Sequence, residues 1–262
     1  MAERLGDRDV AVLASLREFR LMTGNQLLRL HFRGSQQATQ ARKARAALLR
    51  LTELRVIVRL ERRVGGVRAG SQGYLYELSG LGQAVLDLDT AEPRRHRRPT
   101  GTTIPHQSHV LAITELAVCL HEAAEAGRCV VDEFRAEPGC WRRFGGLGGG
   151  HRILKPDAFV RLGVGDYETS AFIEQDMATE SLPTIGRKLA VYLDYWRSGV
   201  EQQLHDVFPR VWWLVPHAKR LAAIKEAIQQ LPCEARELFT VVLTEHAPDL
   251  LTRIPTLEGG AL

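Results

Sequence analysis

Cysteine is scarce in this sequence, and long apolar runs are missing. The four cysteines are Cys119, Cys129, Cys140 and Cys233, and they follow neither a CxxC nor a Cys/His finger spacing. They are too few to form a stabilising disulfide framework in a chain of 262 residues. No apolar stretch is long enough to span a bilayer, and the first residues lack the apolar segment of a secretory signal. We therefore expect a cytoplasmic protein with reduced thiols.

A phosphate-binding loop is also missing. The glycine-rich segment 145–150 lacks the GxGxxG spacing and the Lys-Ser/Thr pair that nucleotide-binding loops carry. Its composition is instead typical of a hairpin tip. The length of the chain exceeds that of a usual single domain, so we expect two domains.

Positive charge is gathered in the first part of the chain. Residues 1–104 contain 19 Lys and Arg against 10 Asp and Glu, whereas the rest contains 16 against 21. Such an asymmetry favours a polyanion as the partner of the N-terminal part. Residues 92–105 carry four arginines between prolines without apolar periodicity, and we interpret them as a basic linker, either lying along a nucleic-acid backbone or simply solvated.

Residues 1–91 predict three short helices and a hairpin. Val10, Leu13 and Leu16 form an apolar stripe, and Thr23 and Gln26 occupy capping-box positions before a second helix. A third helix follows Ser35, with an apolar side made of Ala41, Ala44, Leu48 and Leu51. Its other side carries residue types that contact DNA, namely Gln36, Thr39, Arg42, Lys43 and Arg50.

The strands that follow complete the pattern of a winged helix-turn-helix. Residues 56–60 and 73–78 have strand composition, and a glycine-rich turn lies between them. In such a module the third helix enters the major groove while wing cations, here Arg62, Arg63 and Arg68, approach phosphates. Two alternatives remain, a solvated charged helix face and a protein-binding winged helix.

The second half alternates helices and strands and carries acidic clusters. Asp157 lies on an expected strand over residues 153–162, and Glu174 and Asp176 lie on one face of the next, over residues 169–176. A helix from residue 184 to about 196 carries Lys188, and two further strands, 210–215 and 238–243, flank a helix. Carboxylates from adjacent strands are what a Mg²⁺-dependent phosphodiester site requires.

This order resembles the restriction-endonuclease-like fold of PD-(D/E)xK proteins, and the whole chain resembles the replication-relaxation family of bacterial plasmids and integrative elements. The residues that carry the resemblance are His109 with Leu111, Lys155-Pro156-Asp157-Ala158, Phe172-Ile173-Glu174-Gln175-Asp176, Thr179-Glu180, and Lys188-Leu189-Ala190-Val191-Tyr192. The implied fold class is α/β (α+β): a winged-helix DNA-binding domain (1–91), the basic linker (92–105), and a degenerate nuclease-like domain with a mixed sheet (106–262).

The chain departs from the nuclease pattern at one place. Where acid-x-Lys is expected, Asp176 stands in place of the lysine, and a misplaced charge at the reacting centre is costly. An active site would use Asp157, Glu174 and Asp176 to hold Mg²⁺ or Mn²⁺, with Lys188 or Lys155 supplying the ammonium. We favour the interpretation that this domain does not cleave DNA.

The resemblance implies a DNA-binding accessory protein of a mobile element, acting in plasmid replication or conjugative transfer. Double-stranded DNA is the expected partner, no cofactor is needed to bind it, and no membrane contact is expected. Relaxase or replication proteins and a second copy of the chain are further candidate partners. The alternatives are a metal-dependent endonuclease or nickase, and a transcriptional repressor. Glu115, on the helix that opens the second half, is a candidate additional acidic ligand.

Overall fold

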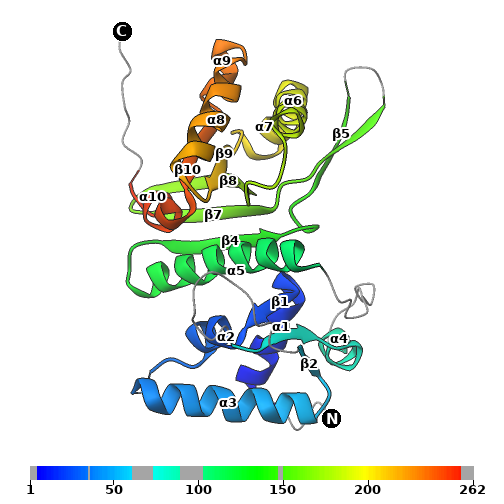
Figure 1. Ribbon diagram of the computed structural model, residues 1–262, viewed down its shortest axis with the longest axis vertical. Coiled ribbons are helices and arrows are strands. Elements are labelled where there is room, and N and C mark those ends of the chain that lie inside the picture. The colour runs from blue at the N-terminus through cyan, green and yellow to red at the C-terminus, as the bar shows by residue number, and fades with distance from the viewer. Residues whose placement is uncertain (1–4, 35, 61–72, 89–102, 147–149, 255–262) are drawn as a thin grey trace. The chain divides into compact units, whose positions relative to one another are not determined.

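The computed structural model describes residues 5–34, 36–60, 73–88, 103–146 and 150–254 (Figure 1). The fold is mixed α/β, as the sequence predicts. The chain divides into two compact units, residues 1–118 and 119–262. The boundary between them falls inside a long helix, α5 (Ile104–Glu125). In the described ranges, no helix combines the length and the apolar character that crossing a bilayer requires.

The first unit begins with three helices. These are α1 (Asp7–Phe19), α2 (Gly24–His31) and α3 (Gln37–Glu53), with a short strand, β1 (Leu21–Thr23), between the first two. Thr23 caps α2 through the capping box that its spacing to Gln26 predicts, since its Oγ1 accepts from the Gln26 amide at 3.1 Å and the Gln26 side chain accepts from the Thr23 amide at 2.9 Å. Ala44, Leu48 and Leu51 bury one side of α3.

Two strands and a fourth helix follow α3. β2 (Ile57–Leu60) and β3 (Leu75–Leu78) pair antiparallel, and β1 joins the other side of β3 to give a sheet of order β1-β3-β2. The sequence did not predict β1, which is three residues long and too short to show a periodicity. Ser79 caps α4 (Gly80–Asp87), since its hydroxyl accepts from the Gly82 amide at 3.0 Å. The first part of α5 contributes Val110 to a buried cluster with Leu21 and Leu75.

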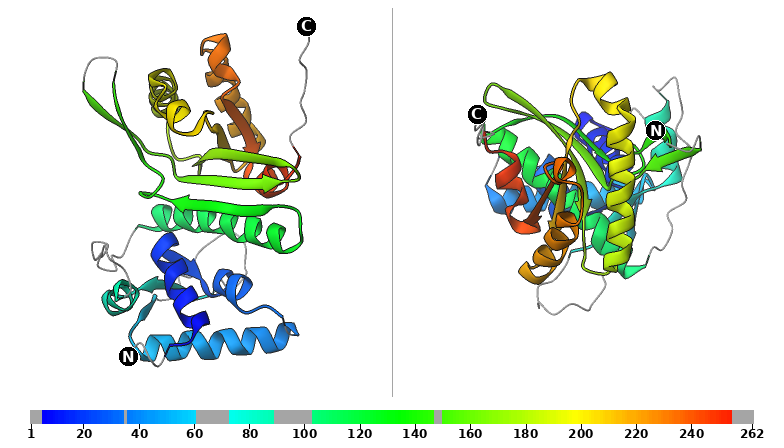
Figure 2. Two further views of the ribbon diagram at one scale, coloured as in Figure 1. Left: turned by 180° about the vertical axis from the view of Figure 1, so that it is seen from behind. Right: turned by 90° about the horizontal axis from the view of Figure 1, so that it is seen from above.

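The second unit is built on a five-stranded mixed sheet of order β10-β9-β8-β7-β4 (Figures 1 and 2). β4 (Val130–Ala136), β7 (Ala158–Val164) and β8 (Tyr167–Gln175) are antiparallel neighbours, whereas β9 (Arg210–Val215) and β10 (Phe239–Leu243) continue from β8 in parallel. Two longer helices, α6 (Leu182–Ser198) and α8 (Ala218–Gln229), pack their apolar sides into the core that includes Phe172 and Trp213. Short helices α7 (Val200–His205), α9 (Cys233–Arg236) and α10 (Ala247–Leu251) complete the unit, with a 3-10 turn at Thr244–His246 before α10.

The segment that the sequence predicts as a single strand forms two strands in the structure. Residues 153–162 were expected to run continuously, but β6 (His151–Leu154) ends before Pro156 and β7 begins after Asp157. β6 pairs with β5 (Arg142–Gly145) in a separate two-stranded sheet, so the break moves the chain from one sheet to another. Proline explains the break, because it has no amide hydrogen to donate to a ladder.

Candidate functional site

The predicted DNA-contacting side of α3 is a polar surface. Arg42 and Lys43 are exposed, and so is Gln36, which precedes the helix as its N-cap residue. Thr39 is half-buried in the first turn. These side chains lie on the helix whose other side is buried in the core of the first unit, so the helix presents polar and cationic groups outward.

Arg50 has a different environment from Arg42 and Lys43. Its Nη2 donates to both carboxylate oxygens of Asp9, at 2.6 and 2.7 Å, and Asp9 itself is buried. The pair ties α3 to α1, which the sequence did not reveal because the partners are far apart in the chain. The wing cations Arg62, Arg63 and Arg68 lie outside the described residues.

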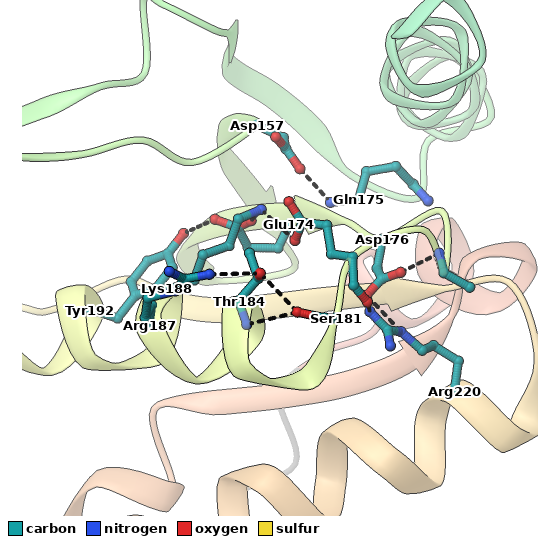
Figure 3. A network of polar contacts seen from close by, with 12 residues as sticks. Asp157, Glu174, Gln175, Asp176, Ser181, Thr184, Arg187, Lys188, Tyr192 and Arg220 are labelled. Carbon is teal, nitrogen blue, oxygen red and sulfur yellow. Dashed lines mark hydrogen bonds and ion pairs between the residues drawn. The ribbon is translucent and has the colours of Figure 1, made fainter. Parts of the chain in front are cut away.

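A second cluster of polar groups lies at one edge of the five-stranded sheet (Figure 3). Asp157 immediately precedes β7, and Glu174 lies near the end of β8. The two strands are antiparallel, with Ala158 opposite Ile173, so the start of one and the end of the other meet at the same edge. Asp157 accepts the backbone amide of Gln175 at 2.7 Å through Oδ2. The two acids therefore lie at neighbouring strands, although Asp157 was expected within a strand and instead precedes β7.

Glu174 is bonded to two side chains of α6. Lys188 Nζ lies 3.1 Å from one carboxylate oxygen, and the Tyr192 hydroxyl donates to the other at 2.7 Å. Lys188 also pairs with Glu180 at 3.2 Å. Residues four apart on a helix share a face, which lets Lys188 and Tyr192 reach the same carboxylate. Lys188 thus lies beside Glu174, as expected if it supplies the ammonium in place of the lysine missing from the acid-x-Lys pattern. Tyr192 was not among the site residues that the sequence predicts.

Burial and charge shift the pKa values of this cluster. Desolvation, followed by the negative charge of Asp157, raises the pKa of Glu174 to about 8, although Lys188 and the Tyr192 hydroxyl pull it down. Burial lowers the pKa of Lys188, but the carboxylates of Glu174, Asp157 and Glu180 outweigh burial and raise it above its ordinary value. An ammonium therefore stays beside Glu174 across the physiological pH range.

Asp176 does not join the other two acids. Strand alternation predicts that it faces the same way as Glu174, but β8 ends at Gln175 and the Asp176 carboxylate is held by Arg220 of α8, at 2.9 Å from Nε and 2.7 Å from Nη2. It also accepts the backbone amide of Ala178. Arg220 donates in addition to the Glu180 carbonyl oxygen at 2.8 Å. Asp176 therefore fixes the turn between β8 and α6, and Figure 3 shows it directed to Arg220.

The carboxylates do not fit a metal site in this arrangement. A Mg²⁺ ion requires several oxygen ligands at near-octahedral positions. Asp176 is engaged by Arg220, Glu174 is engaged by Lys188 and Tyr192, and Asp157 accepts a backbone amide. Across the described part of the chain, no group of three or more His, Cys, Asp and Glu side chains is placed to hold a metal ion.

The remaining candidates of this cluster lie elsewhere. Glu115 accepts from Gln26 at 3.0 Å and pairs with Arg29, so it joins α5 to α2 within the first unit. Lys155 is exposed, with its ammonium 4.8 Å from the centre of the Trp141 ring. Arg220 was missed because no spacing in the sequence links it to Asp176, whereas the four-residue spacing of Lys188 and Tyr192 was a visible signal.

Comparison with known proteins gives a family match. A family model described as replication-relaxation matches residues 13–211, which includes α3, Asp157, Glu174 and Lys188. No curated protein and no solved structure matches this chain. Because the family match spans more than half of the chain, the protein belongs to the replication-relaxation family, a membership that ties it to the replication or relaxation of plasmids and other mobile elements.

Proposed function

We propose that the protein binds duplex DNA through its first unit and serves as an accessory factor in the replication or conjugative transfer of a mobile element. The observation that carries the proposal is the placement of Arg42 and Lys43. Both side chains are exposed on α3, while Ala44 and Leu48 on its other side are buried. The helix can therefore approach a polyanion without unfolding any part of its own core.

The element order of the first unit supports the choice of α3 as a recognition helix. Three helices are followed by the β2-β3 hairpin, which is the order of a winged helix-turn-helix module. In helix-turn-helix proteins the recognition helix lies in the major groove, with its N-terminal residues on base edges. The corresponding residues here, Gln36 and Thr39, are amide and hydroxyl side chains that can donate to and accept from bases.

Electrostatics supports DNA rather than a protein as the partner of this surface. The 19 Lys and Arg among residues 1–104 outnumber the acids by nine, and Arg42 and Lys43, both exposed on α3, contribute to that excess. Contacts of cations with phosphates release condensed counterions, so binding of this kind weakens steeply as salt rises. A protein partner without a strongly acidic surface would not respond in this way.

Fluorescence anisotropy on a labelled duplex tests the proposal. The variant Arg42→Ala/Lys43→Ala should reduce the slope of log affinity against log salt by roughly 2, because each phosphate contact contributes about 0.9. The matched control is Lys219→Ala/Lys225→Ala, which removes two exposed cations from α8. An α3 variant that binds with the wild-type slope would overturn the assignment of this surface.

One observation favours a second candidate function, a metal-dependent endonuclease. Asp157 and Glu174 meet at one sheet edge, and Lys188 lies 3.1 Å from Glu174, so two acids and a lysine of the nuclease pattern converge. Against it stand the diversion of Asp176 to Arg220 and the engagement of both Glu174 oxygens by protein donors. We therefore rank it second to DNA binding without cleavage.

A further inference from the structure

The β5-β6 hairpin of the second unit has no part in either site described above. Its strands project from the five-stranded sheet as a two-stranded arm in Figures 1 and 2. Residues 140–155 contain no Asp or Glu, although acids make up 31 of the 262 residues of the chain. The same segment contains four cationic residues and one histidine, namely Arg142, Arg143, His151, Arg152 and Lys155. We call the described part of this segment, residues 140–146 and 150–155, the basic arm.

One face of the basic arm is anchored to its own unit. Phe144 and Leu154 are buried in the core there, and paired residues of an antiparallel ladder share a face. Arg142 pairs with the buried Glu201 at 3.2 Å, and Arg152 pairs with Asp194 of α6. These contacts fix the orientation of the hairpin, so the residues of its other face are held outward.

The other face of the basic arm is exposed, and its two cations, Arg143 and Lys155, have no counterion within the described residues. Arg143 and His151 are exposed there, on opposite strands, and neither has an ion pair within the described residues. Lys155 follows β6 with the same outward parity and contacts the face of Trp141, which positions its ammonium without neutralising it. Unpaired cations in a segment without acids are the electrostatic footprint of a surface for a polyanion.

We propose that the basic arm is a second nucleic-acid contact, in which Arg143, His151 and Lys155 bind the phosphate backbone of duplex DNA. A two-stranded ribbon is narrow enough to enter a major groove. Gly145 and Gly150 favour close approach, because a side chain added at either would meet nothing within 4 Å and the backbone there is open. The contact rests on the proposed function for the identity of its partner, but it uses a surface on the other unit.

The test measures the salt dependence of duplex binding for the full chain. The variant Arg143→Ala/Lys155→Ala should reduce the slope of log affinity against log salt by roughly 2, at about 0.9 for each lost phosphate contact. Affinity at about 0.1 M salt should fall by at least roughly tenfold. The control Lys219→Ala/Lys225→Ala removes the same charge from exposed positions of α8 and should leave the slope near that of the wild type. Thermal unfolding of each variant verifies folding, and the single variant Arg143→Gln, at an exposed position, replaces the double variant if the latter is unstable.

The outcomes separate this inference from the proposed role of α3. A basic-arm variant with the wild-type slope would overturn the inference. An equal decrease of the slope in the control variant would also overturn it, because the decrease would then reflect only the change in net charge. The slope of log affinity against log salt could decrease in the basic-arm variant and stay at the wild-type value in Arg42→Ala/Lys43→Ala. That result would support DNA binding by the basic arm and contradict DNA binding by α3. If the wild type shows no salt-dependent binding to duplex DNA, both fail.

Discussion

At the scale of single residues, three acids that look equivalent in the sequence have three different environments. Asp157 accepts a backbone amide, Glu174 is bonded to Lys188 and Tyr192, and Asp176 is clamped by Arg220. The strand of Glu174 could be predicted, because period-two alternation is local, whereas Asp157 was expected within a strand and instead precedes β7. Their partners could not, since Arg220 reaches Asp176 only after α8 has packed on the sheet. Alternation also fails for Asp176 because the strand ends one residue before it.

The Arg220 clamp leads to a stability prediction. Arg220→Ala should lower the free energy of unfolding by about 3 kcal/mol, because removal of one partner leaves the buried Asp176 carboxylate uncompensated. Urea denaturation at neutral pH measures the change. Arg187→Ala is the control, since Arg187 is exposed and bonds only to Thr184 among the described residues, and it should change stability by less than about 0.5 kcal/mol. Equal losses in the two variants would contradict a clamping role for Arg220.

Glu174 leads to a prediction about pH. Its pKa is raised from 4.5 to about 8 in the folded protein, so between these values the folded state holds a proton that the unfolded state has lost. Stability contributed by this group is therefore present at low pH and declines as the pH rises toward 8. Glu174→Gln should flatten the fall in melting temperature between pH 5.5 and about 8. An unchanged pH profile in the variant would show that Glu174 is ionised throughout.

At the scale of elements, helices with one apolar face and isolated apolar strands were predictable. The bounds of β9, residues 210–215, agree with the expected strand. Its central residues are all apolar, and a proline lies on each side of it. The prediction of a single strand over residues 153–162 was wrong. β6 ends before Pro156, and β7 begins after Asp157. An apolar pattern shows which residues are buried, but it does not show in which of two sheets they lie.

The contact of α4 with the β2-β3 hairpin can be tested with two glycines of one helix. A Cβ added at Gly82 would overlap the Val56 carbonyl oxygen and lie 2.7 Å from Leu78 Cδ1. Gly82→Ala should therefore lower the free energy of unfolding by about 1 to 3 kcal/mol. Gly80→Ala is the matched control, because nothing lies within 4 Å of its added Cβ. If thermal unfolding shows the same small change for both variants, α4 is not packed as described.

At the scale of the whole molecule, the sequence predicted two parts of opposite charge and a mixed α/β fold. The position of the boundary was harder to predict. The expected linker, residues 92–105, falls mostly outside the described residues, and the two compact units divide within α5. The first turns of α5 pack Val110 with Leu21 and Leu75 and pair Glu115 with Arg29. These contacts bring together residues that are distant in the sequence, so helical periodicity alone could not reveal them.

The carboxylate cluster leads to a prediction about chemistry. Supercoiled plasmid incubated with the protein and Mg²⁺ or Mn²⁺ should remain supercoiled, because Arg220, Lys188 and Tyr192 occupy the carboxylates that an ion would need. Agarose electrophoresis reads the result. Metal-dependent nicking that is lost in Asp157→Ala, and kept in the exposed control Asp249→Ala, would establish the endonuclease instead.

The central claim, that α3 binds duplex DNA, is tested most directly by photocrosslinking. A photoreactive amino acid is placed at position 43 on α3 or at position 204, where Leu204 is 69% exposed on α7, and each protein is irradiated with a labelled duplex. The account predicts a salt-sensitive crosslink from position 43 and at most a weak one from position 204. A duplex that crosslinks equally well from both positions, or not at all from position 43, would contradict it.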